Sequence, residues 1–291
     1  MTMINYSNIN GHLVPAGEAS LKVSDLSVIR GFAIFDFFLF RKGHPLFLDD
    51  YLDRFYRSAQ LLHMEVPSSK TDFARQINQL IERNGLEEGG IRLLLTGGYS
   101  PDGYTPTEPN VLILQYPLPS KTWQSSQGIK LMAHTFLREI PEVKTTNYVT
   151  GISLLPELKR RGFDDLLFVE NGEWIRESVR SNFFLVLDGQ RVVTPGNKVL
   201  LGVTRKQILH LAGKRYQVEE RDVHITELKE AREAFFTSTI KGVLPVVQVD
   251  DQVIGDGKPG PVAEQLYHDF IAHVEAYLEE QSRRARQLME A

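Results

Sequence analysis

One lysine and one glutamate, placed among strand-like apolar runs, constrain this chain more than any other feature. Lys144 precedes a helical segment and a strand-like run, and Glu177 then stands between two such runs. A lysine beside an apolar strand can lose part of its hydration and offer a free amine for Schiff-base chemistry. A glutamate on a neighbouring strand can keep a pyridinium nitrogen protonated. Each residue alone is uninformative, because most lysines are solvated surface groups.

The composition limits the class of protein. The chain has 291 residues, of which 42% are hydrophobic and 24% charged, so we expect a globular protein with two domains. A net charge of −4 offers no basic face for nucleic acid. The chain contains no cysteine, which excludes disulfides, thiolate zinc sites and a cysteine nucleophile. With neither a signal-peptide pattern nor a membrane-spanning run, we expect a cytoplasmic protein.

The first part of the chain predicts a small α+β domain. Apolar runs and helical periodicity indicate, in order, a buried strand, two helices and two paired strands. These are a strand at 32–40, a helix capped by Asp49 or Asp50 and running to Met64, a helix capped near Ser69 or Thr71 and ended by Gly85, and strands at 91–96 and 111–116. The glycine- and tyrosine-rich loop at 97–104 is either a functional loop or a plain solvent loop. Arg54 lies at the edge of the apolar face of its helix, and its simplest interpretation is a surface arginine paired with Asp50 or Asp53.

The second part follows a polar segment at 118–127, which begins beside Pro117, contains Pro119 and which we interpret as a linker. Its pattern predicts strands at 129–134, 166–169, 174–176, 182–187, 191–194 and 234–239, a helix at 148–161, a helix opened by Gly202, and a long helix from Pro261. A helix start after glycine presents N–H groups that suit a phosphate. Strands and helices mix without regular alternation, so we predict an α+β fold with domains at 1–117 and 128–291.

In this order the motifs resemble the class IV aminotransferases, the fold-type IV pyridoxal phosphate enzymes. The resemblance rests on Lys144, then on Glu177 with Ser181 and Asn182, and then on the run 202–205, Gly-Val-Thr-Arg. It implies a two-domain fold like that of D-amino acid aminotransferase, with the cofactor at the domain interface. It also implies a homodimer that converts amino acids and 2-oxo acids.

The resemblance implies a role for each matching residue. Lys144 would form the Schiff base with pyridoxal 5'-phosphate and carry the proton, and Glu177 would pair with the pyridine nitrogen. The other cofactor-binding residues would be Arg54, Tyr148, Ser181, Asn182, Leu201, Val203, Thr204, Ser238 and Thr239. Tyr148 is alternatively a core tyrosine, Leu200 could replace Leu201 on the ring face, and Ser181 and Asn182 more simply brace the loop.

Substrate would be held by residues of the first domain. Arg30 and Arg92 are candidates for the substrate carboxylate, since an arginine fork fits that group. Arg92 could equally be a structural arginine. Phe35, together with Phe32, Ile34 and Phe37, would line an apolar pocket or belong to the ordinary core, and Ile240 would narrow the space above the cofactor.

Departures from the family leave the reaction open. Phe37 replaces a glycine of branched-chain aminotransferases, and Lys241 replaces an acidic residue. The loop at 101–104 lacks the arginine and histidine of D-amino acid aminotransferases, which favours L-amino acids with branched or other apolar side chains. The alternative is 4-amino-4-deoxychorismate lyase, which eliminates pyruvate with the same lysine. A binding module that keeps the fold is disfavoured by the retained Lys144 and Glu177. The scattered histidines predict no metal site.

Overall fold

The computed structural model describes residues 4–118, 122 and 127–290. The chain forms two compact units that are not continuous in sequence. The first comprises Met1–Ser120, Val143–Asn147 and Val274–Ala291, and the second comprises Lys121–Glu142 and Tyr148–His273. Most of the predicted linker lies outside the described residues, and the continuous domain ranges expected from the sequence stay a prediction. Among the described residues, no helix is long and apolar enough to cross a membrane.

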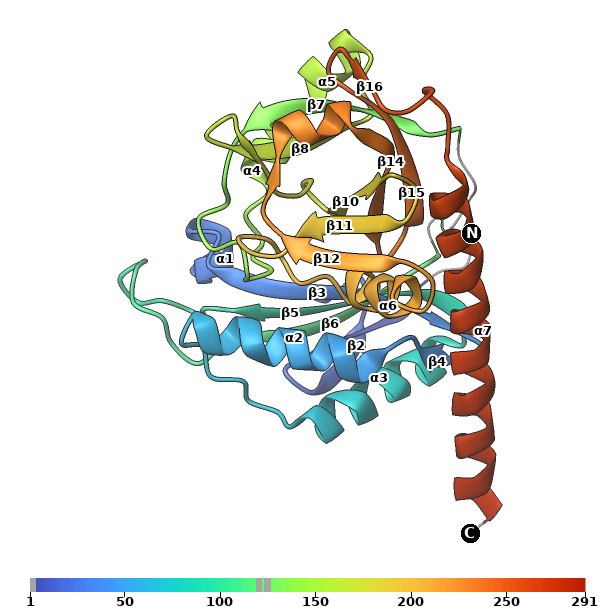
Figure 1. Cartoon of the computed structure of the whole chain (residues 1–291). Coiled ribbons are helices and arrows are strands. Elements are labelled where there is room, and N and C mark those ends of the chain that lie inside the picture. The colour runs from blue at the N-terminus through green and yellow to red at the C-terminus, as the bar shows by residue number, and fades with distance from the viewer. Residues whose placement is uncertain (1–3, 119–121, 123–126, 291) are drawn as a thin grey trace. The chain divides into compact units, whose positions relative to one another are not determined.

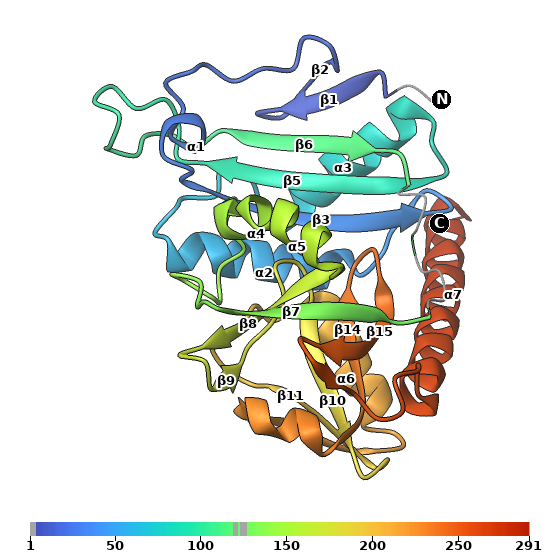
Figure 2. The ribbon, with the colours of Figure 1, turned by 90° about the horizontal axis from the view of Figure 1, so that it is seen from above.

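The first unit is built on an antiparallel sheet with the strand order β2-β1-β6-β5-β3-β4 (Figures 1 and 2). Its elements are β1 (Tyr6–Ile9), β2 (His12–Pro15), α1 (Leu26–Ile29), β3 (Ala33–Arg41), β4 (His44–Pro45), α2 (Leu48–Leu61), α3 (Lys70–Asn84), β5 (Glu88–Thr96) and β6 (Val111–Tyr116). The predicted strands at 32–40, 91–96 and 111–116 are confirmed within a few residues at their ends.

Strand β3 divides its side chains between the two faces of this sheet. Ile34, Phe38 and Phe40 are fully buried, whereas Phe35 and Phe37 are only half-buried. Successive side chains of a strand point to opposite faces, so the first set lies on the face that packs against α2, with Asp36 among it. Ile34 is therefore a core residue, as the alternative interpretation held. Phe35 and Phe37 lie on the other face.

Helices α2 and α3 begin with different kinds of N-cap. Ser69 caps α3 as predicted, accepting a hydrogen bond from the N–H of Asp72, and Gly85 ends it at φ 66°. The predicted cap of α2 is wrong: Asp49 and Asp50 lie in the first turn, and the N-cap is Phe47 at φ 53° without a side-chain hydrogen bond. The Phe47 ring packs on Tyr277 with 4.7 Å between centroids, and the main chain of Phe47 and Leu48 forms hydrogen bonds with Tyr277.

The second unit contains a ten-stranded mixed sheet, counted over the described residues. Nine strands follow the order β12-β11-β10-β14-β15-β7-β8-β9-β13, and β16 pairs with β15. Its elements are β7 (Ile129–Thr135), α4 (Val149–Ser153), α5 (Leu155–Arg161), β8 (Asp165–Glu170), β9 (Trp174–Ile175), β10 (Asn182–Leu187), β11 (Arg191–Pro195), α6 (Val203–Ala212), β12 (Gln217–Arg221), β13 (Val223–His224), the 3-10 helix η1 (Ile225–Lys229), β14 (Ala231–Ser238), β15 (Gly242–Val249) and β16 (Gln252–Val253). Helix α7 (Pro261–Glu290) begins in this unit.

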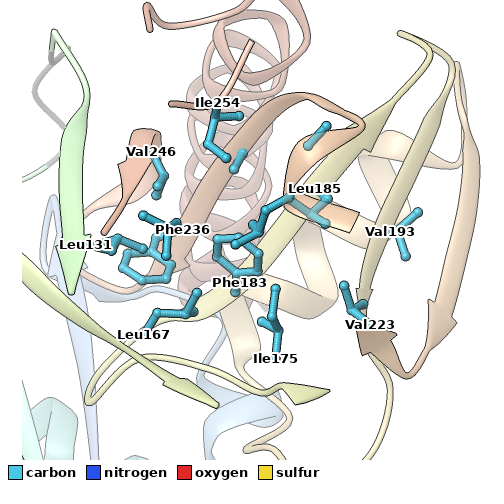
Figure 3. Packing of buried hydrophobic residues seen from close by; sticks show 14 of the residues in the cluster. Leu131, Leu167, Ile175, Phe183, Leu185, Val193, Val223, Phe236, Val246 and Ile254 are labelled. Carbon is cyan, nitrogen blue, oxygen red and sulfur yellow. The ribbon is translucent and has the colours of Figure 1, made fainter. Parts of the chain in front are cut away.

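The core of this unit lies on one face of β10 and β14 (Figure 3). Phe183 and Phe236 meet edge to face there, with 5.9 Å between ring centroids. Asn182, one residue before Phe183, therefore points to the opposite face of β10. Asn182 is the register partner of Thr237 on β14, so the start of β10 lies beside the end of β14. This end of the sheet carries most of the predicted cofactor residues of the second unit.

The predicted helix at 148–161 is not continuous. It is divided into α4 and α5 at Leu154, and Pro156 stands in the first turn of α5. Proline has no N–H to donate to the carbonyl four residues earlier, and its ring crowds that carbonyl. The break follows from this missing donor, and Tyr148 becomes the N-cap of α4.

Candidate active site

Glu177 is a buried carboxylate surrounded by hydrogen-bond donors. Its side chain is 6% exposed and accepts hydrogen bonds from Arg138 Nε at 3.0 Å, from Asn182 Nδ2 at 3.1 Å and from the Leu200 N–H at 3.1 Å. Arg138 Nη2 forms a second contact with it. Burying a carboxylate is costly unless an opposite charge and hydrogen bonds compensate it, and Arg138 supplies that charge. Sequence reasoning missed Arg138, because a single arginine in a loop carries no motif.

Asn182 and Ser181 brace the segment around this carboxylate. Asn182 Nδ2 also donates to the Leu200 carbonyl at 2.7 Å, which ties the start of β10 to the loop before α6. The Ser181 carbonyl accepts from the Ser178 N–H at 2.8 Å. The Ser181 hydroxyl is buried, and no partner for it is found in the part of the chain that the structure describes. These contacts agree with the bracing interpretation.

The N-terminus of α6 has no side-chain cap. Its N-cap is Gly202, which offers no side-chain acceptor, and the first intrahelical bond runs from Lys206 to the Gly202 carbonyl. The N–H groups of Val203 and Thr204 thus lack helical acceptors, as at every helix start. A Cβ on Gly202 would lie 2.2 Å from Asn182 Oδ1, so the close approach of these two residues requires glycine.

The turn between β14 and β15 carries the predicted hydroxyl donors. Ser238 ends β14, and its Oγ accepts the Lys241 N–H at 3.3 Å; Thr239 and Ile240 are half-buried in the turn. Lys241, whose role the sequence leaves unexplained, forms an ion pair with Asp165 at 2.7 Å.

Two more predicted residues of this unit are partly accessible. Tyr148 is half-buried at the N-cap of α4, so it is not a fully buried core tyrosine. Leu201 is 41% exposed, so its apolar side chain is accessible to the ring of a ligand.

In the first unit, Lys144 runs alongside β3. Its carbonyl accepts the Phe35 N–H at 2.9 Å, and the neighbouring Thr146 N–H donates to the Ala33 carbonyl at 3.1 Å. The Lys144 ammonium lies 4.7 Å from the centroid of the Phe35 ring. The lysine is therefore fixed on the half-buried face of β3, by main-chain bonds that do not depend on its side chain.

Arg92 shares this face. It is the register partner of Phe37, and its guanidinium lies 5.5 Å from the centroid of Phe35 and 5.2 Å from that of Tyr116. The Phe37 ring covers Gly90, where a Cβ would meet Phe37 Cζ at 2.4 Å. The half-buried face of β3 and β5 thus presents aromatic rings together with two cationic side chains.

Arg54 has a partner that the sequence did not predict. Arg54 Nε donates to Asp36 Oδ2 at 3.0 Å and Nη2 donates to Asp36 Oδ1 at 2.5 Å, and both side chains are largely buried. Asp53, one of the partners expected from the sequence, pairs with Lys70. The expected contact of Arg54 with a phosphate stays a prediction. In such a contact the phosphate would share the guanidinium with Asp36.

Arg30 braces the loop at 97–104. It is exposed, and its Nε donates to the Gly103 carbonyl at 3.0 Å. The N–H of Leu26 donates to Gly98, and the Asp102 carboxylate accepts the N–H groups of Thr105 and Tyr104. The Thr105 N–H contributes most to holding the pKa of Asp102 well below its usual range. The loop is therefore held by several hydrogen bonds, while Pro101, Asp102 and Tyr104 are exposed.

Both units mix helices and strands, and Lys144 belongs to the first unit while Glu177 belongs to the second. Comparison with known proteins identifies the family. Residues 33–249 match the family model of amino-transferase class IV. The chain therefore belongs to the class IV aminotransferases. The sequence-based predictions of family, fold, enzyme class and pyridoxal phosphate as cofactor are confirmed.

Relatives of two substrate classes are similar to this chain. The crystal structure of the branched-chain amino acid aminotransferase from Escherichia coli matches at TM-score 0.84 and 25% identity over 94% of this chain and 95% of its own. The D-alanine aminotransferase of Listeria monocytogenes serotype 4b is 25% identical over 91% of this chain and 95% of its own length. The branched-chain-amino-acid aminotransferase of Pseudomonas aeruginosa is 26% identical over 90% and 92%. Similarity alone does not choose the substrate.

Proposed function

We propose that this protein is a pyridoxal 5'-phosphate-dependent aminotransferase for apolar L-amino acids and 2-oxo acids, with Lys144 as the catalytic base. The observation that carries the proposal is the position of Lys144: its backbone is bonded to β3 while its amine stays over the half-buried ring of Phe35. The relatives reported above are aminotransferases, which supports transamination over the alternative lyase reaction.

The residues fit the chemical groups of this cofactor. A phosphate needs several N–H and O–H donors, which Val203 and Thr204 offer at an uncapped helix start and Ser238 and Thr239 offer at the end of β14. Glu177 would accept a hydrogen bond from the pyridine nitrogen, Leu201 would cover a ring face, Tyr148 would approach the phenolic oxygen, and Arg54 would add a charge at the phosphate. Ser181 and Asn182 would hold Glu177 in place.

When bound, pyridoxal phosphate supplies an electron sink for the electrons left after the α-proton is removed. Residues of the chain would supply the proton transfer and the orientation of the cofactor. Lys144 Nζ would take the proton from the α-carbon of the amino acid and return it at the cofactor carbon that carries the amine. Glu177 would hold the proton on the pyridine nitrogen, and Arg138 orients the Glu177 carboxylate. The Phe35 ring lies against the Lys144 amine, with 4.7 Å between Nζ and the ring centroid.

The face of β3 supports the proposed substrate class. Phe35, Phe37 and Tyr116 offer apolar contact there, and Ile240 of the second unit would add a further apolar side chain. Arg92, with Arg30 as the second candidate, would hold the substrate carboxylate. The rings of Phe35 and Tyr116 orient the guanidinium of Arg92 on this face.

Replacing Arg92 by leucine is expected to raise the KM for the amino acid and the 2-oxo acid about 10- to 100-fold with a smaller change in kcat, because a charged hydrogen bond contributes about 1.5–3 kcal/mol. Arg92→Lys should recover little, since an ammonium cannot form the paired bonds of a guanidinium. Steady-state kinetics measures both. The matched control is Arg83→Leu, which removes an arginine 4.7 Å from the Tyr6 ring centroid. Equal KM values for Arg92→Leu and the native protein would exclude Arg92 from carboxylate binding.

The function itself is tested by absorbance spectra of the purified holoenzyme, before and after addition of single L- and D-amino acids without a 2-oxo acid. Movement of the yellow band to the pyridoxamine position with apolar L-amino acids is the expected result. A response to D-alanine alone would overturn the proposed stereochemistry. A band that persists with every amino acid, while aminodeoxychorismate yields pyruvate, would establish the lyase. Failure to bind pyridoxal phosphate would overturn the proposal.

We also propose that the protein is a cytoplasmic homodimer. This rests on the family resemblance and on the sequence pattern. Light scattering of the purified holoenzyme checks the dimer, and a monomeric mass would contradict it.

A further inference from the structure

Lys241 makes specific contacts in the second unit, and none of the roles proposed above involves this residue. Its ammonium donates to Asp165 Oδ2 at 2.7 Å and lies 5.4 Å from the centroid of the Phe236 ring. Its own N–H donates to Ser238 Oγ. Lys241 therefore connects the turn after β14 to the first residue of β8, which is far away in sequence.

Asp165 continues this connection towards Glu177. The Asp165 side chain is 9% exposed, and its Oδ1 accepts the Ser178 hydroxyl at 3.1 Å and the Leu166 N–H at 2.9 Å. Ser178 is 2% exposed and directly follows Glu177. A series of three side chains, Lys241, Asp165 and Ser178, thus joins the turn that carries Ser238 and Thr239 to the segment that carries Glu177.

We propose that Lys241 is a positioning residue that fixes the turn holding Ser238 and Thr239 relative to Glu177, and so sets the distance between the phosphate end and the ring-nitrogen end of the cofactor site. The inference rests on the proposed function, because only a bound cofactor makes that distance matter. The structure gives the physical reason. The buried Asp165 carboxylate accepts hydrogen bonds from Lys241 in the turn and from Ser178 in the segment after Glu177. The Lys241 ammonium compensates the charge of this buried carboxylate.

The test uses Lys241→Met, which keeps the apolar stem over Phe236 and removes the ammonium. Titration of the apoenzyme with pyridoxal phosphate should show an affinity about tenfold weaker, the size of effect expected for a residue that acts through others. The ³¹P resonance of the bound cofactor should shift, because the donors at the turn are no longer fixed. Lys241→Arg should restore both, since it returns a cation to Asp165.

A purely structural role is separated by the double variant Lys241→Met/Asp165→Asn, which removes both charges together. It should regain the Tm of the native apoenzyme, because no uncompensated charge remains, but its cofactor affinity should stay low. Recovery of the affinity together with the Tm would overturn the proposal, as would an unchanged affinity in Lys241→Met. If Lys241→Met does not fold, the cofactor affinity of the double variant tests the proposal in its place. If the native protein binds no pyridoxal phosphate, the proposed function and this inference are overturned together. If the native protein binds it and Lys241→Met binds it with the same affinity, the inference alone is overturned.

Discussion

Replacing Lys144 by alanine is expected to abolish transamination, with kcat falling by about 10³-fold or more, because proton transfer by a positioned base contributes about 10²–10⁴ and the Schiff base is lost as well. The fold should remain, since the bonds between this segment and β3 are made by the main chain. The measurement is steady-state turnover with an apolar L-amino acid and a 2-oxo acid, together with the absorbance band of the bound cofactor.

The control for this variant is Lys22→Ala. Lys22 also lies over an aromatic ring of the first unit, 5.0 Å from the centroid of Tyr99, but it has no proposed role in the reaction. Its removal should leave kcat unchanged. Added methylamine should restore part of the activity of Lys144→Ala by supplying an amine from solution. Near-native turnover by Lys144→Ala without added amine would rule out this lysine as the base.

The sequence predicted the strands of this fold better than its helix boundaries. Strand β10 was predicted at its observed ends, because a short apolar run between turn residues has few alternatives. The cap of α2 was wrong, because Phe47 takes a left-handed conformation and packs on Tyr277, a tertiary contact that the local sequence pattern does not contain. The break at Leu154 could have been predicted from Pro156, which the helical periodicity placed inside one continuous helix.

The parts of the candidate site that form through distant pairs could not be predicted from one sequence. Arg138 meets Glu177 across 39 residues, and Lys241 meets Asp165 across 76. An arginine in a loop and a lysine in a turn have the same local pattern as many solvated side chains. Motif spacing made Glu177 a candidate, but its compensating charge, Arg138, comes from a tertiary contact that spacing does not contain.

Glu177→Gln is expected to damage both the reaction and the fold, and the two effects can be separated. Glutamine keeps the size of the side chain but places an NH₂ group among donors from Arg138, Asn182 and Leu200. The unfolding free energy should fall by about 2 kcal/mol, since donors at a charged hydrogen bond lose their acceptor. Turnover should fall about 10²–10³-fold, as expected when one preorganised electrostatic contact is removed.

The separation uses two further variants, measured by urea unfolding and by kcat. In Glu177→Gln/Arg138→Met the guanidinium that lost its carboxylate is gone, so stability should partly return while turnover stays low, because the pyridine nitrogen still lacks its partner. Glu233→Gln is the matched control: this buried carboxylate accepts the N–H groups of Val262 and Ala263 at the start of α7 and has no proposed role in the reaction. It should lose stability and keep kcat. If the double variant recovered turnover along with stability, Glu177 would act only as the structural partner of Arg138.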